Sequence, residues 1–179
     1  QYGRYLLDAA LETLSTWKAQ GKKLIPLVVK IADEHLTAPG FAERLAVKAK
    51  EMDVEPKWLY LELTETKRHI LNARLKAAGE ELKQQGFNLT VRYTGLVSPA
   101  FKEMPIDGVK IGRQMWTKSP DRKSNMLAQS LGQVCQELGI FLAADDVASQ
   151  ADADRIKALG FSYAQGPLVG PKVKPGELL

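Results

Sequence analysis

The stretch LYLELTET, residues 59–66, decides the fold of this 179-residue chain. Its aromatic and aliphatic residues favour a strand, and a pattern of helical spacing follows from Lys67. Two carboxylates, Glu62 and Glu65, lie where the strand gives way to that helix. In α/β barrels the carboxyl ends of the strands carry the functional side chains. We therefore expect Glu62 and Glu65 to belong to a site.

Strand-like segments alternate with helical patterns along the rest of the chain. The predicted strands lie at 24–31, from residue 59, and at 88–93, 108–111, 140–144 and 162–164. Strict alternation indicates a parallel sheet, either a (β/α) barrel or an open doubly wound sheet. An open sheet usually shows a glycine-rich phosphate loop after an early strand, and the sequence has none. We predict an α/β fold of the TIM-like barrel type with about six parallel strands, in a single domain over residues 1–179.

Two predicted helices carry apolar stripes of nearly the same spacing. In the first helix, 5–20, the stripe consists of Leu7, Leu11, Leu14 and Trp17. In the helix that begins near 119 and ends at Gly139, it consists of Leu127, Leu131, Val134 and Leu138. Both patterns are those of amphipathic helices, whose apolar face usually packs on a core. The aliphatic run at 24–31 predicts a strand covered on both faces by helices.

Composition excludes several classes of protein. A net charge of +4 arises from 25 basic and 21 acidic residues spread along the chain, so we expect no DNA or RNA partner. The single cysteine, Cys135, falls in an apolar helical pattern, which predicts a buried thiol, no intrachain disulfide and a reducing compartment. No apolar run is long enough for a membrane span, and we expect no signal peptide before the first helix. We expect a cytoplasmic location, which a membrane anchor on a larger sensor protein would also allow.

The predicted strand ends collect charged and polar side chains at one edge of the sheet. These residues are Lys30, Glu62, Glu65, Arg92, Lys110, Asp145, Asp146 and Gln165. A divalent-metal phosphodiesterase needs clustered oxygen ligands, but here three cations lie among four acids. Lys30 and Arg92 are expected to neutralise Glu62 and Asp145 without a metal. Ion pairs that only rim a barrel and a ligand-binding site both remain open, ahead of catalysis.

Three segments resemble the EAL-domain family, which comprises the cyclic di-GMP phosphodiesterases and their degenerate receptor relatives. Residues 61–65 are similar to the family's Glu-Leu-Thr-Glu signature, whose first acid binds metal and whose second steadies a loop. Residues 104–111 resemble Leu-Pro-Val-Asp-x-Leu-Lys-Ile-Asp, whose lysine lies in the active site, here Lys110. Residues 163–166 match the terminal Gln-Gly, here Gln165 and Gly166. The resemblance begins after the family's first two strands, which implies an N-terminally incomplete barrel without the Glu-Ala-Leu motif.

The chain departs from the family pattern where the family binds metal. Lys30 stands in place of an asparagine ligand, and Arg92 begins the segment that replaces the family's paired aspartates. Residues 144–148, Ala-Asp-Asp-Val-Ala, replace Ala-Glu-Gly-Val-Glu, so Asp145 keeps a shorter carboxylate and the second acid is lost. These departures imply that metal binding fails.

The resemblance and its departures together imply a catalytically inactive EAL-like signalling domain in a bacterial sensor protein. It would act as a cyclic di-GMP receptor or a protein-interaction module, without a cofactor or metal. The expected ligand-binding residues are Lys30, Glu62, Glu65, Arg92, Lys110, Asp145 and Gln165, with Glu62, Lys110 and Asp145 as vestiges of a catalytic site.

Two alternatives to this reading remain open. One is an active cyclic di-GMP phosphodiesterase that uses Mg²⁺ or Mn²⁺ with Glu62, Glu65, Asp145 and Asp146 as ligands. The other is a purely structural domain that binds a partner protein and has an ion-paired mouth. Because an incomplete barrel exposes two sheet edges, we also expect them to be covered, either by the chain's own rearrangement or by a partner such as a second EAL-like copy in a dimer.

Overall fold

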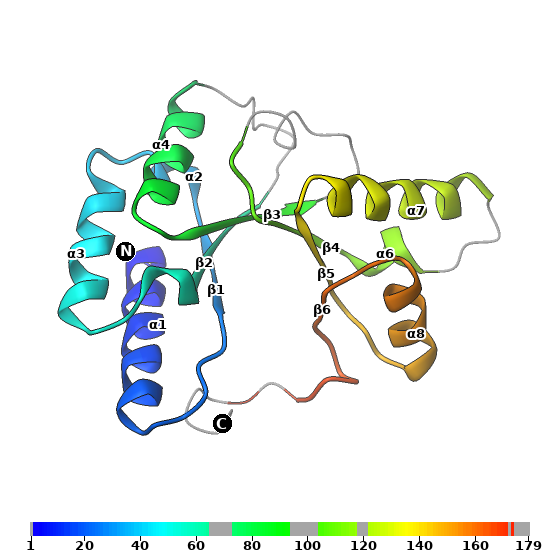
Figure 1. Ribbon diagram of the computed structural model, residues 1–179, viewed down its shortest axis with the longest axis horizontal. Helices are drawn as coiled ribbons and strands as arrows, with labels where there is room; N and C mark the ends of the chain where they lie inside the picture. Colours follow the sequence, from blue (N-terminus) through cyan, green and yellow to red (C-terminus); the bar gives the residue numbers. More distant parts are fainter. Residues whose placement is uncertain (1, 65–72, 94–103, 118–121, 172, 174–179) are drawn as a thin grey trace. The chain divides into compact units, whose positions relative to one another are not determined.

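Six parallel strands form one sheet in the order β1-β2-β3-β4-β5-β6, and the described connections between strands contain helices except the one from β3 to β4 (Figure 1). The computed structural model describes residues 2–64, 73–93, 104–117, 122–171 and 173. The chain divides into two compact units, one formed mainly by residues up to Thr90 and one by Val91–Tyr93 and residues 107–171. The order of the sheet confirms the predicted α/β alternation.

The first unit begins with a helix whose apolar stripe is buried, as expected of an amphipathic helix. Its helices and strands are α1 (Tyr2–Ala19), β1 (Leu27–Ile31), α2 (Asp33–Leu36), α3 (Phe41–Glu51), the 3₁₀ turn η1 (Pro56–Trp58), β2 (Leu59–Thr64), α4 (Ala73–Gln84) and the start of β3 (Asn88–Tyr93). On α1, Leu11 and Leu14 are fully buried, and Leu7 and Trp17 nearly so. The helix packs against β1, so its stripe forms part of the core.

Strand β1 has one covered face and one open face, which differs from the predicted strand covered on both faces. Val29 and Ile31 are buried, whereas Val28 is 54% exposed and Lys30 is exposed. Adjacent side chains of a strand point to opposite faces, so Val28 and Lys30 share the open face. An aliphatic run of this length does not reveal how many faces are covered.

The second unit packs its longest helix through small side chains. It contains the end of β3, β4 (Gly108–Ile111), α6 (Arg113–Trp116), α7 (Arg122–Glu137), β5 (Phe141–Ala144), α8 (Gln150–Ala158) and β6 (Tyr163–Ala164). The buried face of α7 consists of Ala128, Gly132 and Cys135. A Cβ at Gly132 would lie 2.3 Å from the carbonyl oxygen of Leu159, so only glycine permits this approach.

The predicted apolar stripe of α7 lies on the surface and is not buried. Leu127, Val134 and Leu138 are 63%, 48% and 57% exposed, and Leu131 is partly exposed. The thiol of Cys135 is buried as predicted, and burial raises its pKa to about 11. The apolar period of α7 therefore marks a surface, while the small residues beside it make the contact with the sheet.

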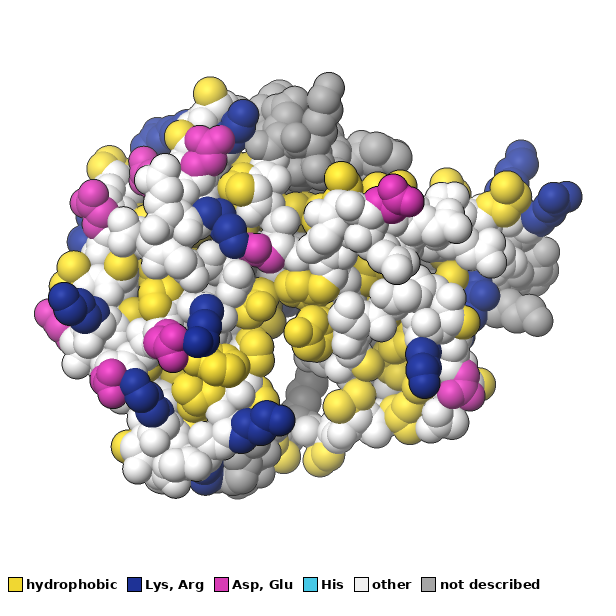
Figure 2. All heavy atoms as spheres, viewed as in Figure 1, with side chains coloured by type: hydrophobic (Ala, Val, Ile, Leu, Met, Phe, Trp, Pro, Cys, Tyr) yellow, Lys and Arg dark blue, Asp and Glu magenta, His cyan; other side chains and the backbone are white. Residues whose placement is uncertain are grey.

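The surface of the chain mixes charges of both signs. Figure 2 shows dark blue basic and magenta acidic side chains interspersed over the first unit, without a continuous basic patch on the described part of that face. None of the helices in the described ranges is long and apolar enough to cross a bilayer.

Candidate functional site

Four of the predicted site residues meet at the carboxyl ends of the strands in the second unit. Arg92 forms an ion pair with the Asp145 carboxylate. Lys110 Nζ lies 3.9 Å from Asp145 Oδ2 and donates a hydrogen bond of 2.5 Å to Gln165 Oε1. The expected neutralisation of Asp145 by Arg92 is thus confirmed. We call Arg92, Lys110, Asp145 and Gln165 the strand-end cluster.

Parallel pairing of the strands explains why these side chains meet. Lys110 lies opposite Ala143 of β5, which lies opposite Tyr163 of β6. The sheet pattern continues past the strands, because Asp145 N–H donates to the Ile111 carbonyl at 2.9 Å and Gln165 N–H donates to the Ala144 carbonyl at 2.8 Å. Residues at the same level of neighbouring parallel strands lie side by side, so strand ends alone can assemble the cluster.

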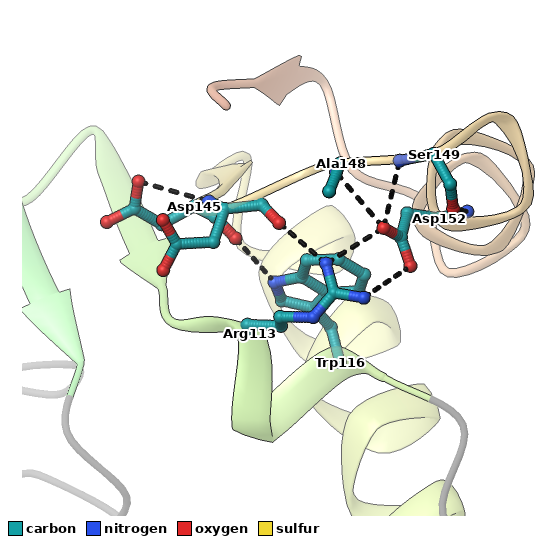
Figure 3. Close-up of polar contacts among 7 residues, drawn as sticks. Arg113, Trp116, Asp145, Ala148, Ser149 and Asp152 are labelled. Atoms are coloured by element: carbon teal, nitrogen blue, oxygen red, sulfur yellow. Dashed lines mark hydrogen bonds and ion pairs between the residues drawn. The ribbon is translucent and has the colours of Figure 1, made fainter. Parts of the chain in front are cut away.

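The loop after β5 is held by a second set of polar contacts (Figure 3). Arg113 donates two hydrogen bonds to the Asp152 carboxylate, at 2.8 and 3.1 Å, and a third to the Asp146 carbonyl at 2.7 Å. Trp116 Nε1–H donates to the Asp145 carbonyl at 3.2 Å. The donors of these hydrogen bonds lie on α6, and the bonds hold the backbone of the loop that carries Asp145. We call Arg113, Trp116 and Asp152 the loop latch.

Asp152 also caps helix α8. Its Oδ2 accepts the backbone N–H groups of Ala148 and Ser149, while its own N–H donates to Ser149 Oγ, which completes a capping box. Hydrogen bonds from Arg113, followed by the one from the Ala148 N–H, lower the pKa of Asp152 to about 2. The carboxylate is therefore ionised throughout the physiological range and serves the latch and the cap together.

In the first unit, Lys30 and Glu62 occupy opposite positions of the β1–β2 pair. The Glu62 side chain is 1% exposed, whereas Lys30 is exposed. Paired positions in parallel strands share a face of the sheet, so Glu62 of β2 lies on the same face of the sheet as Lys30 of β1. Glu65 lies outside the described residues.

The acidic side chains of the described residues are dispersed or paired with cations. No group of three or more His, Cys, Asp or Glu side chains that could hold a metal occurs among them. The Asp145 carboxylate already faces two cations of the strand-end cluster, Arg92 and Lys110. Asp146, a proposed ligand of the alternative reading, has a left-handed backbone with φ of 60°. A cation-neutralised carboxylate has little electrostatic attraction left for Mg²⁺ or Mn²⁺.

The loop latch was missed by sequence reasoning. Arg113 and Trp116 lie on a helix of one turn, and no pattern relates them to Asp152. A signal for one part was present, because the Ser149-x-x-Asp152 spacing is that of a capping box. The pairing with Arg113 depends on the approach of α6 to the loop, which only the folded chain reveals.

Known proteins are similar to this chain over most of its length. The family model "EAL domain" covers residues 2–172. A cyclic di-GMP phosphodiesterase, PdeB of Shewanella oneidensis, is 27% identical over 146 residues, which are 79% of this chain. The chain spans only 17% of the length of that curated relative.

Solved structures show the same fold at low sequence identity. The PaMucR phosphodiesterase in a cyclic di-GMP complex has a TM-score of 0.87 and 22% identity, covering 100% of this chain and 74% of that one. The EAL domain of DcpA from Mycobacterium smegmatis has a TM-score of 0.87 and 23% identity, covering 99% and 81%. The fold is the TIM-like α/β barrel type of these proteins, here with six strands. The family match over residues 2–172 and this shared fold establish that the chain belongs to the EAL domain family.

Proposed function

We propose that this chain is a non-hydrolytic EAL domain that binds cyclic di-GMP in a bacterial signalling protein. It would work in the cytoplasm as part of a larger sensor. The observation that carries the proposal is the ion pair between Arg92 and Asp145, flanked by Lys110. A singly charged cation here repels a divalent metal by about 2 to 8 kcal/mol at about 4 Å, depending on the effective dielectric, because the charge of the metal doubles the interaction of two unit charges.

The same cations are suited to the phosphates of a dinucleotide. The Arg92 guanidinium can donate two parallel hydrogen bonds to phosphate oxygens, and Lys110 offers a compact positive charge. Gln165, which accepts from Lys110 at 2.5 Å, carries an amide that can also donate to a ligand. Lys30 and Glu62 are further candidate contacts from the first unit, and Glu65 is a candidate outside the described residues.

Calorimetric titration with cyclic di-GMP tests the binding part of the proposal. We expect saturable heat for the parent chain and a loss of roughly ten- to a hundredfold in affinity for Arg92→Ala, as when a charge-assisted hydrogen bond is removed. Lys157→Ala, an exposed lysine on α8, removes the same charge and should bind normally. Absence of heat at high micromolar ligand would reject the receptor function and leave a partner-protein module.

Hydrolysis assays test the other part. We expect no linear dinucleotide from cyclic di-GMP with Mg²⁺ or Mn²⁺ present. Metal-dependent turnover that is lost in Glu62→Gln would instead establish an active phosphodiesterase. Binding without turnover supports the proposal in full.

A further inference from the structure

We propose that Trp116 and Arg113 of α6 are positioning residues for the strand-end cluster. They hold two peptide groups of the loop after β5, and these peptide groups set the Asp145 carboxylate and the backbone of Gln165. All of these residues lie in the second unit. The effect on ligand affinity rests on the proposed function, whereas the positioning itself does not depend on a ligand. Trp116 and Arg113 lie outside the cluster, so each acts through residues that the ligand would contact.

The peptide group that joins Asp145 to Asp146 links Trp116 to the cluster. Its carbonyl oxygen, that of Asp145, accepts the Trp116 Nε1–H at 3.2 Å (Figure 3). Its N–H, that of Asp146, donates to Asp145 Oδ1 at 3.2 Å, and Oδ2 of the same carboxylate pairs with Arg92. A peptide group is planar and rigid, so a bond that fixes its oxygen also fixes the direction of its N–H. Trp116 thereby orients the carboxylate that holds Arg92.

The next peptide group, between Asp146 and Val147, links Arg113 to the cluster in the same way. Its carbonyl oxygen accepts from Arg113 at 2.7 Å, and its N–H, that of Val147, donates to the Gln165 carbonyl at 3.0 Å. Gly166 allows this approach, because a Cβ there would lie 2.4 Å from the backbone nitrogen of Val147. Arg113 is therefore connected to the cluster through the backbone, at Gln165.

Helix α6 can support the loop because its own side chains are held. Trp116 is fully buried, and its carbonyl accepts from Arg155 at 3.3 Å. Arg113 is fixed by its two bonds to Asp152 and lies 5.3 Å from the centroid of the Trp116 ring. Asp146, which both peptide groups share, has φ of 60°, a conformation that non-glycine residues adopt at a steric cost. The donors of α6 keep the loop in this conformation.

A measurement without nucleotide tests the positioning. Side-chain NMR of Arg92 reports its ion pair, because pairing slows the exchange of guanidinium N–H protons with water. We expect exchange to be roughly threefold or more faster in Trp116→Phe, which removes the N–H donor and keeps an aromatic ring in the core. The Arg92 signal is identified by its loss in Arg92→Lys. The matched control is Trp58→Phe on η1 of the first unit, which makes the same chemical change and should leave the signal unchanged.

Calorimetry with cyclic di-GMP tests whether the positioning matters for the ligand. We expect Trp116→Phe to weaken affinity by roughly three- to tenfold, as when a hydrogen bond is lost. In an Asp145→Ala background the same substitution should have no effect, because the carboxylate that Trp116 orients is already absent. Arg113→Ala should still weaken binding in that background, since it acts on Gln165. A purely structural role of Trp116 would weaken binding by the same factor in both backgrounds.

The two measurements separate this inference from the function on which its ligand rests. A parent chain that binds no cyclic di-GMP would reject the proposed function, and the exchange of Arg92 would then decide the inference alone. Unchanged Arg92 exchange in Trp116→Phe, an equal change in Trp58→Phe, or equal losses of affinity in both backgrounds would overturn the role of Trp116. An Arg113→Ala effect that vanishes in the Asp145→Ala background would overturn the connection through Gln165.

Circular dichroism checks that each variant is folded. If Trp116→Phe does not fold, benzothienylalanine at position 116 takes its place in both measurements. This residue keeps the size of the indole and lacks only the N–H donor, so the expected results are the same.

Discussion

Helices α1 and α7 carry apolar stripes of nearly identical spacing but have opposite surroundings. Leu11 and Leu14 of α1 are fully buried against the first unit, whereas Leu127 and Leu138 of α7 are more than half exposed. The period of a helix shows that one face is apolar, but it does not show what covers that face. On α7, small residues make the contact with the rest of the unit that leucines make on α1.

The largest expected effect tests this comparison directly. Leu11→Ala should lower the free energy of unfolding by about 3 to 5 kcal/mol, because it removes a fully buried side chain and leaves a cavity. Leu127→Ala should change it by about 0.5 kcal/mol or less, as is usual for surface substitutions. Urea denaturation at low protein concentration, where self-association does not contribute, measures both. Equal losses in the two variants would show that both stripes are buried.

A methyl group at the small-residue face of α7 should have the next largest effect. Gly132→Ala places a Cβ 2.3 Å from the Leu159 carbonyl oxygen, so the free energy of unfolding should fall by about 1 to 3 kcal/mol despite the better helix propensity of alanine. Ser130→Ala, on the exposed side of α7, is the matched control and should change stability by about 0.5 kcal/mol or less. Thermal unfolding distinguishes the two. A neutral Gly132→Ala would mean that α7 can move away from α8.

The loop latch should give the second unit a stability that depends on pH. The pKa of Asp152 is lowered from 3.8 to about 2, so the folded state holds fewer protons than the unfolded state in this range. The stabilisation that comes from the ionised Asp152 is therefore fully present above about pH 4 and is lost as the pH falls towards about 2. Asp152→Asn should lower the melting temperature at neutral pH. A plot of melting temperature against pH should also fall less steeply between about pH 4 and about pH 2, which we call the acid limb.

The neighbouring Asp154→Asn serves as the control for the latch. It removes the same charge from α8, where Asp154 accepts a hydrogen bond only from Gln150 among the contacts resolved here. The acid limb should keep its slope in this variant. If both variants flatten the limb equally, the dependence arises from general charge and not from the latch.

The smallest expected effect concerns the backbone beside the strand-end cluster. Asp146 has φ of 60°, a conformation that glycine adopts without steric cost, and its carbonyl still accepts from Arg113 in any variant. Asp146→Gly should therefore raise the free energy of unfolding by up to about 1 kcal/mol. Asp146→Ala keeps the Cβ and should not. A loss of stability in Asp146→Gly would reveal a structural role for the Asp146 carboxylate.

Much of the sheet was predictable, since strand composition and strict alternation leave few parallel arrangements. The segments predicted at 88–93 and 108–111 coincide with β3 and β4, and the strand of LYLELTET is β2. The strand-end cluster was also predictable, because residues that end neighbouring parallel strands are brought together by the sheet itself. The prediction of a single domain over residues 1–179 stays a prediction.

The remaining features depend on contacts that a linear pattern does not encode. The fit of Gly132 against Leu159 and the grip of Arg113 on Asp152 each join residues more than 25 positions apart. Nothing in the local composition of α6 or α7 distinguishes these partners from others. The exposure of the α7 stripe follows from the first of these contacts, so it could not be predicted either.

The carboxylate of Asp152 has a consequence for how this part of the chain opens. It receives Arg113 from α6, the amides of Ala148 and Ser149 from the loop, and it closes the first turn of α8. None of these three segments can loosen without breaking a bond to the same group. Local fluctuations here should consequently be cooperative, with α6, the loop and α8 fraying as one unit and not in sequence.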